Sequence, residues 1–173
     1  MSERPIDALV IGAGPAGLAT SRELTRLGIT HVVLERGDRI GHTWATLYDS
    51  LVLHTARGLS ALPGLRFPSS VPVFPTRRDL LAYLDRYASL FKLPVETRSD
   101  VTSLSRDDST RWIARTSTGL TLEARAVVVA TGIVSNPYVP DLPGRSRFAG
   151  RIFLSLVLGA YAAGWLMFLA FGR

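Results

Sequence analysis

The sequence contains no cysteine and a single lysine, Lys92. Without cysteine the chain has no disulfide, no thiolate metal ligand and no redox-active C-x-x-C pair, which argues against a disulfide reductase. The net charge of +6 and the pI of about 10.5 come from scattered arginines. Basic segments that bind nucleic acid are typically runs of five or more like charges, and none occurs here. We therefore expect no nucleic-acid partner.

The first residues also lack the apolar stretch of a secretory signal, because Met1 to Pro5 are mostly polar. The 173 residues suit one domain of ordinary size, and a hydrophobic content of 47% supports a real core. We therefore expect the main domain to be cytoplasmic.

A glycine-rich pattern follows directly after a short apolar strand, residues 7–11. Its G-x-G-x-x-G spacing falls on Gly12, Gly14 and Gly17, and an alanine- and leucine-rich helix comes next. The first glycine permits a tight turn, the second lets the backbone approach a pyrophosphate, and the third lets the helix pack on the strand. Pro15 and Ala16 open the helix, whose N-terminal N–H groups favour phosphate. This pattern predicts a dinucleotide-binding βαβ unit.

The second half of that unit supports the prediction. Gly28 is a good helix terminator, and residues 31–35 read as a second apolar strand that ends in Glu35. Glu35 lies 18 positions after Gly17, close to the roughly 20 expected for the carboxylate that accepts from a ribose hydroxyl. The alternative is a glycine-rich turn of an ordinary α/β protein, with Glu35 a solvated strand end.

The rest of the chain predicts an irregular stretch to residue 75, one helix and several strands. Thr76 and Asp79 form a near capping box for a helix over 77–91. Its inward side chains are expected to be Leu80, Leu81, Leu84, Tyr87 and either Leu90 or Phe91. Strands are expected at 95–97 and 101–104, in a hairpin of 111–116 with 120–124, and at 126–130. The fold class is α/β, a Rossmann-like domain with a parallel sheet and a small antiparallel insert.

Four landmarks, in order, give the chain a family resemblance over about residues 5–150. They are Gly12-x-Gly14-x-x-Gly17 with Glu35, then Gly41-His42-Thr43-Trp44, then Phe74-Pro75-Thr76 before a helix, then Ala130-Thr131-Gly132 leading to Pro137, Pro140 and Pro143-Gly144. The first suits many flavoproteins, and the second and fourth are more specific. Together they resemble the flavin-containing monooxygenases, with their auxin-forming and Baeyer–Villiger relatives.

The resemblance implies FAD at the first nucleotide site, with NADPH as co-substrate and a small organic molecule oxygenated at nitrogen, sulfur or a carbonyl. It assigns the ribose to Glu35, the pyrophosphate to the glycines, and the flavin half to Gly41 and Trp44. The other implied contacts are Arg36 beside Glu35, Val101 at the adenine, and Thr131 with Gly132 at the far side of the nucleotide. The cofactor carries most of this chemistry, so no catalytic side chain is assigned. Trp44 has an alternative role as a core residue that anchors a loop.

The pattern departs from the family after residue 150. The family's next landmark resembles F-x-G-x-x-x-H-S, but Leu154 stands where histidine is expected. The sequence has no second G-x-G-x-x-G for NADPH. The histidines show no metal-ligand spacing, and no metal site is expected.

Residues 152–171 contain no charged side chain, and about 20 apolar residues can span a bilayer. We divide the chain into an FAD-binding domain, 1–150, and an apolar C-terminal helix, 151–173. Three interpretations stay open: a membrane anchor for a cytoplasmic domain, a truncation or frameshift that replaced the catalytic half, or a buried soluble helix. The corresponding functions are an enzyme whose NADPH site comes from elsewhere, or a non-catalytic membrane-associated remnant. A third is a dehydrogenase that uses NAD at the first site.

Overall fold

The computed structural model describes residues 6–106, 111–132 and 147. The chain divides into two compact units, Met1–Gly132 and Ile133–Arg173, and the fold of the first is given below. The expected boundary at residue 150 and the apolar segment 152–171 lie outside the described residues. None of the helices among these residues combines the length and hydrophobicity that a membrane span requires.

The N-terminal βαβ unit forms as the glycine pattern predicted. Strand β1 (Ile6–Ile11) leads into helix α1 (Pro15–Arg26), and strand β2 (His31–Leu34) pairs with β1 in parallel. Gly28 adopts a φ of +69° just after α1, which confirms it as the helix terminator.

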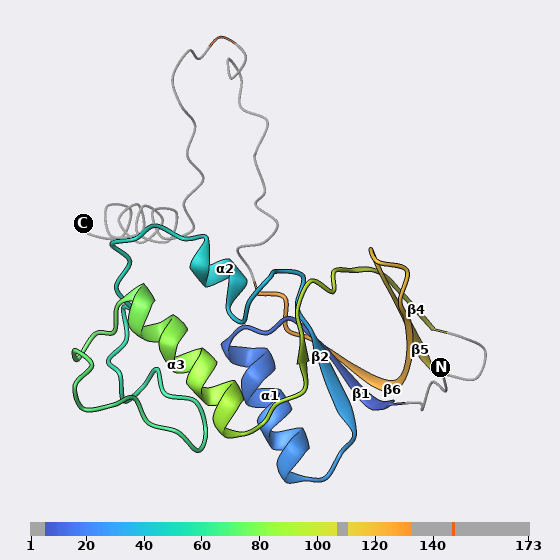
Figure 1. Ribbon diagram of the computed structural model, residues 1–173, viewed down its shortest axis with the longest axis horizontal. Helices are drawn as coiled ribbons and strands as arrows, with labels where there is room; N and C mark the ends of the chain where they lie inside the picture. Colours follow the sequence, from blue (N-terminus) through green and yellow to red (C-terminus); the bar gives the residue numbers. More distant parts are fainter. Residues whose placement is uncertain (1–5, 107–110, 133–146, 148–173) are drawn as a thin grey trace, which may run out of the picture. The chain divides into compact units, whose positions relative to one another are not determined.

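The remaining elements complete one sheet and two further helices among the described residues. They are α2 (His42–Ala45), α3 (Arg77–Leu90), β3 (Val95–Glu96), β4 (Val101–Arg106), β5 (Trp112–Thr116) and β6 (Thr121–Val129). The strand order is β3-β2-β1-β6-β5-β4. Figure 1 labels this series from β2 to β4. The first four strands are mutually parallel, whereas β5 and β4 follow β6 in antiparallel order. The predicted α/β class, a parallel sheet with a small antiparallel part, is confirmed.

Strand β6 corrects the prediction of two separate strands at 120–124 and 126–130. Ala124 pairs with Trp112 of β5 on one side and with Ile6 of β1 on the other, so the strand continues without a break. The charged Arg125 lies between the two predicted segments, and its side chain is exposed and lies 3.5 Å from Asp7. A charged residue continues a strand when its side chain can reach water.

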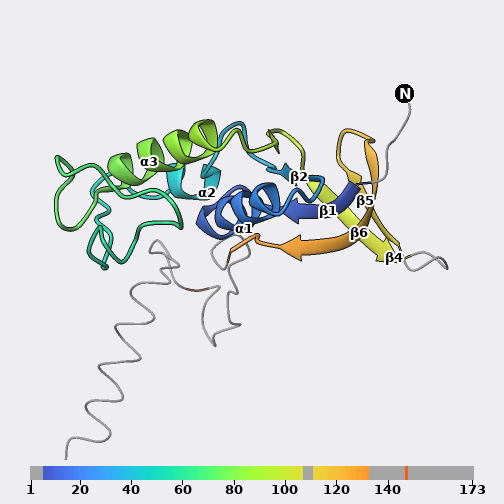
Figure 2. The same cartoon turned by 90° about the horizontal axis from the view of Figure 1, so that it is seen from below.

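Alternate side chains of the sheet enter two separate cores. One core lies between the sheet and the helices α1 and α3, which cover the same face (Figure 2). Its buried members include Val10, Leu18, Val33, Leu84 and Tyr87. The second core, on the opposite side of β1 and β2, joins them to the antiparallel strands and includes Leu9, Val32, Leu34, Ala114 and Ala124. The period-two alternation of a strand explains this division.

Helix α3 begins with the predicted capping box. The Thr76 hydroxyl accepts from the Asp79 N–H over 3.2 Å, and the Asp79 carboxylate accepts from the Thr76 N–H over 3.0 Å. Of the two alternatives for the last inward position, Phe91 packs against the core, whereas Leu90 is 55% exposed. Tyr83 takes a core position that the pattern missed.

Two tyrosine hydroxyls of α3 fix the irregular segment that precedes the helix. The Tyr83 hydroxyl accepts from the Leu62 N–H over 2.7 Å and donates to the Leu65 carbonyl over 2.8 Å. The Tyr87 hydroxyl donates to the Pro63 carbonyl over 2.7 Å. Burial raises the pKa of the Tyr87 phenol to about 12. The segment therefore has a defined place on the helix although it contains little regular structure.

Candidate dinucleotide-binding site

Close packing requires two of the glycines, Gly12 in the loop between β1 and α1 and Gly17 in the first turn of α1. Gly12 has a φ of +106°, and a Cβ atom there would lie 2.5 Å from the carbonyl oxygen of Ala130. A Cβ atom on Gly17 would lie 1.9 Å from the carbonyl oxygen of Gly12. The expected tight turn and close contact between helix and strand are both present, and no larger residue fits either position without a shift of backbone.

The middle glycine faces open space. Gly14 is the N-cap of α1, with φ −81° and ψ −175°, and a Cβ atom there would meet nothing within 4 Å. Pro15 follows in the first turn, which contains no acidic residue and has no side-chain cap. The first N–H groups of a helix lack partners inside the helix, so this end of α1 can accept a phosphate. These residues fit the pyrophosphate of a dinucleotide.

Glu35 joins this loop to the loop that follows β2. Its side chain is 6% exposed, and one carboxylate oxygen accepts from the Ala13 N–H over 2.8 Å. The other oxygen accepts from the Gly37 N–H over 2.9 Å. The sequence predicted an acid at this position but not these two backbone partners. A carboxylate has about four acceptor positions, so the group can still accept from a ribose hydroxyl.

The loop after β2 is closed by backbone bonds to the segment that precedes β4. The Arg98 N–H donates to the Gly37 carbonyl over 2.7 Å, and the Ser99 N–H donates to the Glu35 carbonyl over 2.9 Å. Val101, the expected adenine contact, begins β4 two residues later. Arg36 is exposed in the same loop. The fold thus connects the predicted adenosine residues through one short set of backbone contacts.

The end of β6 lies beside the glycine loop, and the predicted cofactor residues Thr131 and Gly132 follow it there. The Ala130 N–H donates to the Ile11 carbonyl over 2.8 Å. A Cβ atom on Gly12 would lie 3.3 Å from the Cα of Thr131. Gly132, three residues beyond the end of β6, adopts a φ of +72°. The glycine loop and these two residues therefore line one edge of the sheet.

Gly41 connects the glycine loop to α2, the short helix that carries Trp44. It is the left-handed N-cap of α2, with φ +67°, and its N–H donates to the Ala13 carbonyl over 3.0 Å. A Cβ atom there would approach the Leu84 side chain of α3 to 3.1 Å. Trp44 is half-buried and packs against the helix-side core. Its core role is therefore present, and its proposed contact with a flavin stays a prediction.

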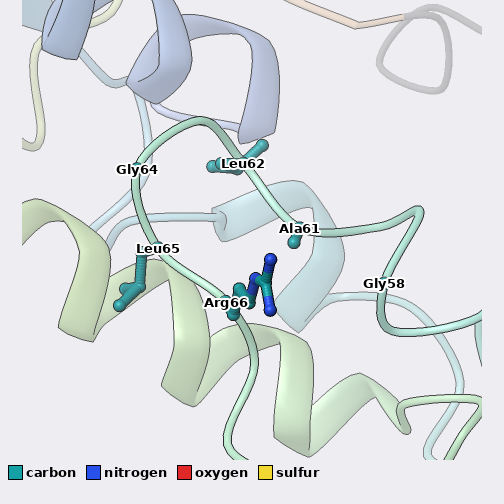
Figure 3. Close-up of a pocket in the computed structure, with 6 residues that line it drawn as sticks. All are labelled: Gly58, Ala61, Leu62, Gly64, Leu65 and Arg66. Atoms are coloured by element: carbon teal, nitrogen blue, oxygen red, sulfur yellow. The ribbon is translucent and has the colours of Figure 1, made fainter.

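An open cavity lies apart from these residues, in the segment that the α3 tyrosines hold. Its volume is about 410 Å³. The lining residues are Gly58, Ala61, Leu62, Gly64, Leu65 and Arg66, the last being the one charged side chain among them (Figure 3). None of the predicted cofactor-binding residues contributes to it. In the same described part of the chain, no group of His, Asp or Glu side chains is placed to hold a metal ion.

A family model covers most of the chain. The model for pyridine nucleotide-disulphide oxidoreductases matches residues 9–152. This range contains the glycine loop, Glu35 and the end of β6.

Curated relatives place the sequence among flavin monooxygenases. The chain is 38% identical over 144 residues to a probable indole-3-pyruvate monooxygenase, YUCCA1, of Arabidopsis thaliana. It is also 38% identical over 145 residues to indole-3-pyruvate monooxygenase YUCCA1 of Oryza sativa. These matches cover 82% and 83% of this chain but 35% and 36% of the relatives. The chain thus spans about a third of the length of these relatives.

A solved structure gives the same result. The flavin-containing monooxygenase from Stenotrophomonas maltophilia superposes with a TM-score of 0.80 at 34% identity, over 84% of this chain and 44% of that one. A steroid monooxygenase bound to NADP superposes with a TM-score of 0.72 at 29% identity, over 85% and 30%.

Proposed function

Since this chain belongs to the pyridine nucleotide-disulphide oxidoreductase family, and within it to the flavin-containing monooxygenases, we propose that it is the FAD-binding portion of such an enzyme. The main support is the loop at Gly14, where open space meets uncapped helix N–H groups beside the buried Glu35 carboxylate. That combination suits a pyrophosphate followed by a ribose.

In this proposal each loop has one task. The glycine loop and the α1 N-terminus bind the pyrophosphate, Glu35 accepts from the adenosine ribose, and Val101 lies near the adenine. Thr131, Gly132, Gly41 and Trp44 extend the site toward the flavin half. Bound FAD would supply redox and oxygenation chemistry, and the chain's residues would hold and orient it.

The reaction we propose consumes NADPH and O2 and oxygenates a small organic substrate at nitrogen, sulfur or a carbonyl carbon. The support for this reaction comes from the named activities of the relatives and from the NADP bound to the steroid monooxygenase. The sequence has a single G-x-G-x-x-G, so NADPH would be bound by residues outside it.

The absorbance spectrum of the full purified chain tests the first step. We expect one bound flavin per chain, with a flavin band that heat-released cofactor identifies as FAD. Folded but colourless protein that does not take up added FAD would overturn the proposal. In that case, retention of NAD would favour a dehydrogenase. FAD binding without NADPH oxidation by this chain alone is the expected result, because NADPH would be bound by residues outside it.

We also propose that residues 152–171 associate with membranes, on the basis of their uncharged sequence. The full chain should then float with liposomes, and the double variant Leu158→Arg and Leu166→Arg should not. Equal flotation of the two proteins would contradict this.

A further inference from the structure

We propose that Arg77 is a positioning residue that fixes α2, and with it Trp44, beside the glycine loop. This inference rests on the proposed function, because Trp44 matters to a cofactor only if FAD binds here. Its structural basis is a set of contacts at the two ends of α2.

Helix α2 cannot fix its own orientation. It has four residues, His42–Ala45, and none of them is fully buried. A single helical turn is unstable alone, because ordering its backbone costs more than its one or two hydrogen bonds return. Contacts with neighbouring elements must therefore set the direction of Trp44.

The N-terminal end of α2 is held by backbone. The Gly41 N–H donates to the Ala13 carbonyl over 3.0 Å, and Gly41 is buried against Leu81 and Leu84 of α3. This end therefore touches both the glycine loop and α3.

The C-terminal end is held by one side chain. The Arg77 guanidinium donates to the Ala45 carbonyl over 2.8 Å and also to the Leu47 carbonyl. It forms an ion pair with Asp49 as well. Ala45 is the last residue of α2 and directly follows Trp44. An arginine is suited to such a position because its planar fork presents several donors at fixed angles.

Arg77 is itself rigidly placed. It is the first residue of α3, directly after the Thr76 capping box, and its N–H donates to the Leu51 carbonyl over 2.8 Å. The guanidinium therefore holds the end of α2 in a fixed place relative to α3. Loss of these bonds would free α2 at the end that carries Trp44.

The structure separates the two kinds of contact that Arg77 makes. Asp49 is 95% exposed, and exposed ion pairs contribute little. The carbonyl bonds are part-buried and should carry the effect. Arg78, the next residue, is exposed and provides a control with the same charge change.

Hydrogen exchange on the full chain, without flavin, tests the first half of the proposal. We compare R77A, R77K, D49N and R78A. In R77A we expect exchange in residues 42–49 to rise at least tenfold while β1 stays unchanged. R77K should be intermediate, and D49N and R78A should match the parent. Unchanged exchange in residues 42–49 of both R77A and R77K would overturn the proposal.

FAD titration with flavin fluorescence tests the second half. R77A should bind FAD about tenfold more weakly, with R77K between it and the parent. Its bound-flavin fluorescence should resemble that of W44F, and the double variant should show no more change than either single one. Faster exchange with unchanged FAD affinity and fluorescence would also overturn the proposal. A parent chain that binds no FAD would overturn the proposed function instead, and exchange would still decide whether Arg77 holds α2.

Discussion

The carboxylate of Glu35 accepts a hydrogen bond from the backbone N–H of Ala13, 22 residues earlier in the chain. The same group accepts from the Gly37 N–H. Glu35 therefore connects the glycine loop to the loop after β2 through protein contacts alone. The residue expected to recognise a ribose also shapes the site that receives it.

Glu35→Ala should destabilise the cofactor-free chain. It removes two charge-assisted bonds from part of the molecule that is closed to water, a loss of about 3 kcal/mol. Glu35→Gln keeps one carbonyl oxygen and should lose about half as much. Urea denaturation without flavin measures both. Glu96 is exposed, so Glu96→Gln serves as the control. Equal midpoints for Glu35→Ala and the parent would contradict the role in the free chain.

In the chain with cofactor, Glu35→Ala should also weaken FAD binding by roughly 1.5–3 kcal/mol, the value for a hydrogen bond to a charged group. Isothermal titration under conditions where the variant is fully folded isolates this effect. An unchanged dissociation constant would refute the ribose contact and leave the structural role intact.

Gly14→Val should abolish cofactor binding while the fold persists. A Cβ atom at Gly14 meets no protein atom within 4 Å, and its φ and ψ are open to any residue. The loss of stability should not exceed about 1 kcal/mol, the usual range for an N-cap change. The added side chain occupies the space that the pyrophosphate needs. Flavin content after purification, beside the melting temperature, is the measurement, and normal flavin content would refute the site.

Gly17→Ala should lower the stability of the fold, whereas Gly14→Val should chiefly lower cofactor binding. Its Cβ atom would lie 1.9 Å from the Gly12 carbonyl oxygen, so α1 must move away from β1. Overpacking of this kind costs about 1–3 kcal/mol. Gly58 faces open space, and Gly58→Ala is the matched control. Two variants with the same unfolding midpoint would show that the contact is not as close as described.

Alkaline pH should destabilise the fold through Tyr87. Its pKa is about 12 in the folded chain because the phenol is buried, against about 10 when unfolded. Below pH 10 both states keep the proton, so the contribution to stability is constant. Between pH 10 and 12 the unfolded phenol loses its proton and the folded one does not, so stability falls as pH rises.

Tyr87→Phe tests this dependence. The variant should lose about 1 kcal/mol at neutral pH, because the bond to the Pro63 carbonyl is gone. Its melting temperature should then fall less steeply from pH 9 to 12 than that of the parent. Part of the fall in melting temperature with pH should remain in this variant, because burial also raises the pKa of Tyr83. Tyr48→Phe removes a phenol at an exposed position and serves as the control.

The parts of the fold that the sequence predicted depend on local rules. The glycine spacing, the Gly28 terminator and the Thr76–Asp79 capping box each need only neighbouring residues, and all three have the predicted geometry. The position of Glu35 followed from a fixed spacing after Gly17. FAD binding by these residues stays a prediction, which the flavin content of Gly14→Val tests.

The features that the sequence missed depend on distant partners. Tyr83 is buried because its hydroxyl meets backbone groups 18 and 21 residues away. Arg77 bonds carbonyls 30 and 32 residues earlier, and every residue has a carbonyl, so no pattern marks these acceptors. The prediction divided strand β6 at Arg125, whose exposed side chain lies 3.5 Å from the distant Asp7.

Strand β6 links the two cores of the described residues. Its first half closes the core beside β5, and its second half runs along β1 to the glycine loop. Because both halves belong to one strand and share Ala124, loss of the pairing with β5 removes support from the pairing with β1, and the reverse also holds. The two cores should therefore be lost together on heating, in one cooperative transition. An assay of unfolding at Trp112 would then report on the integrity of the nucleotide loop at the far end of the strand.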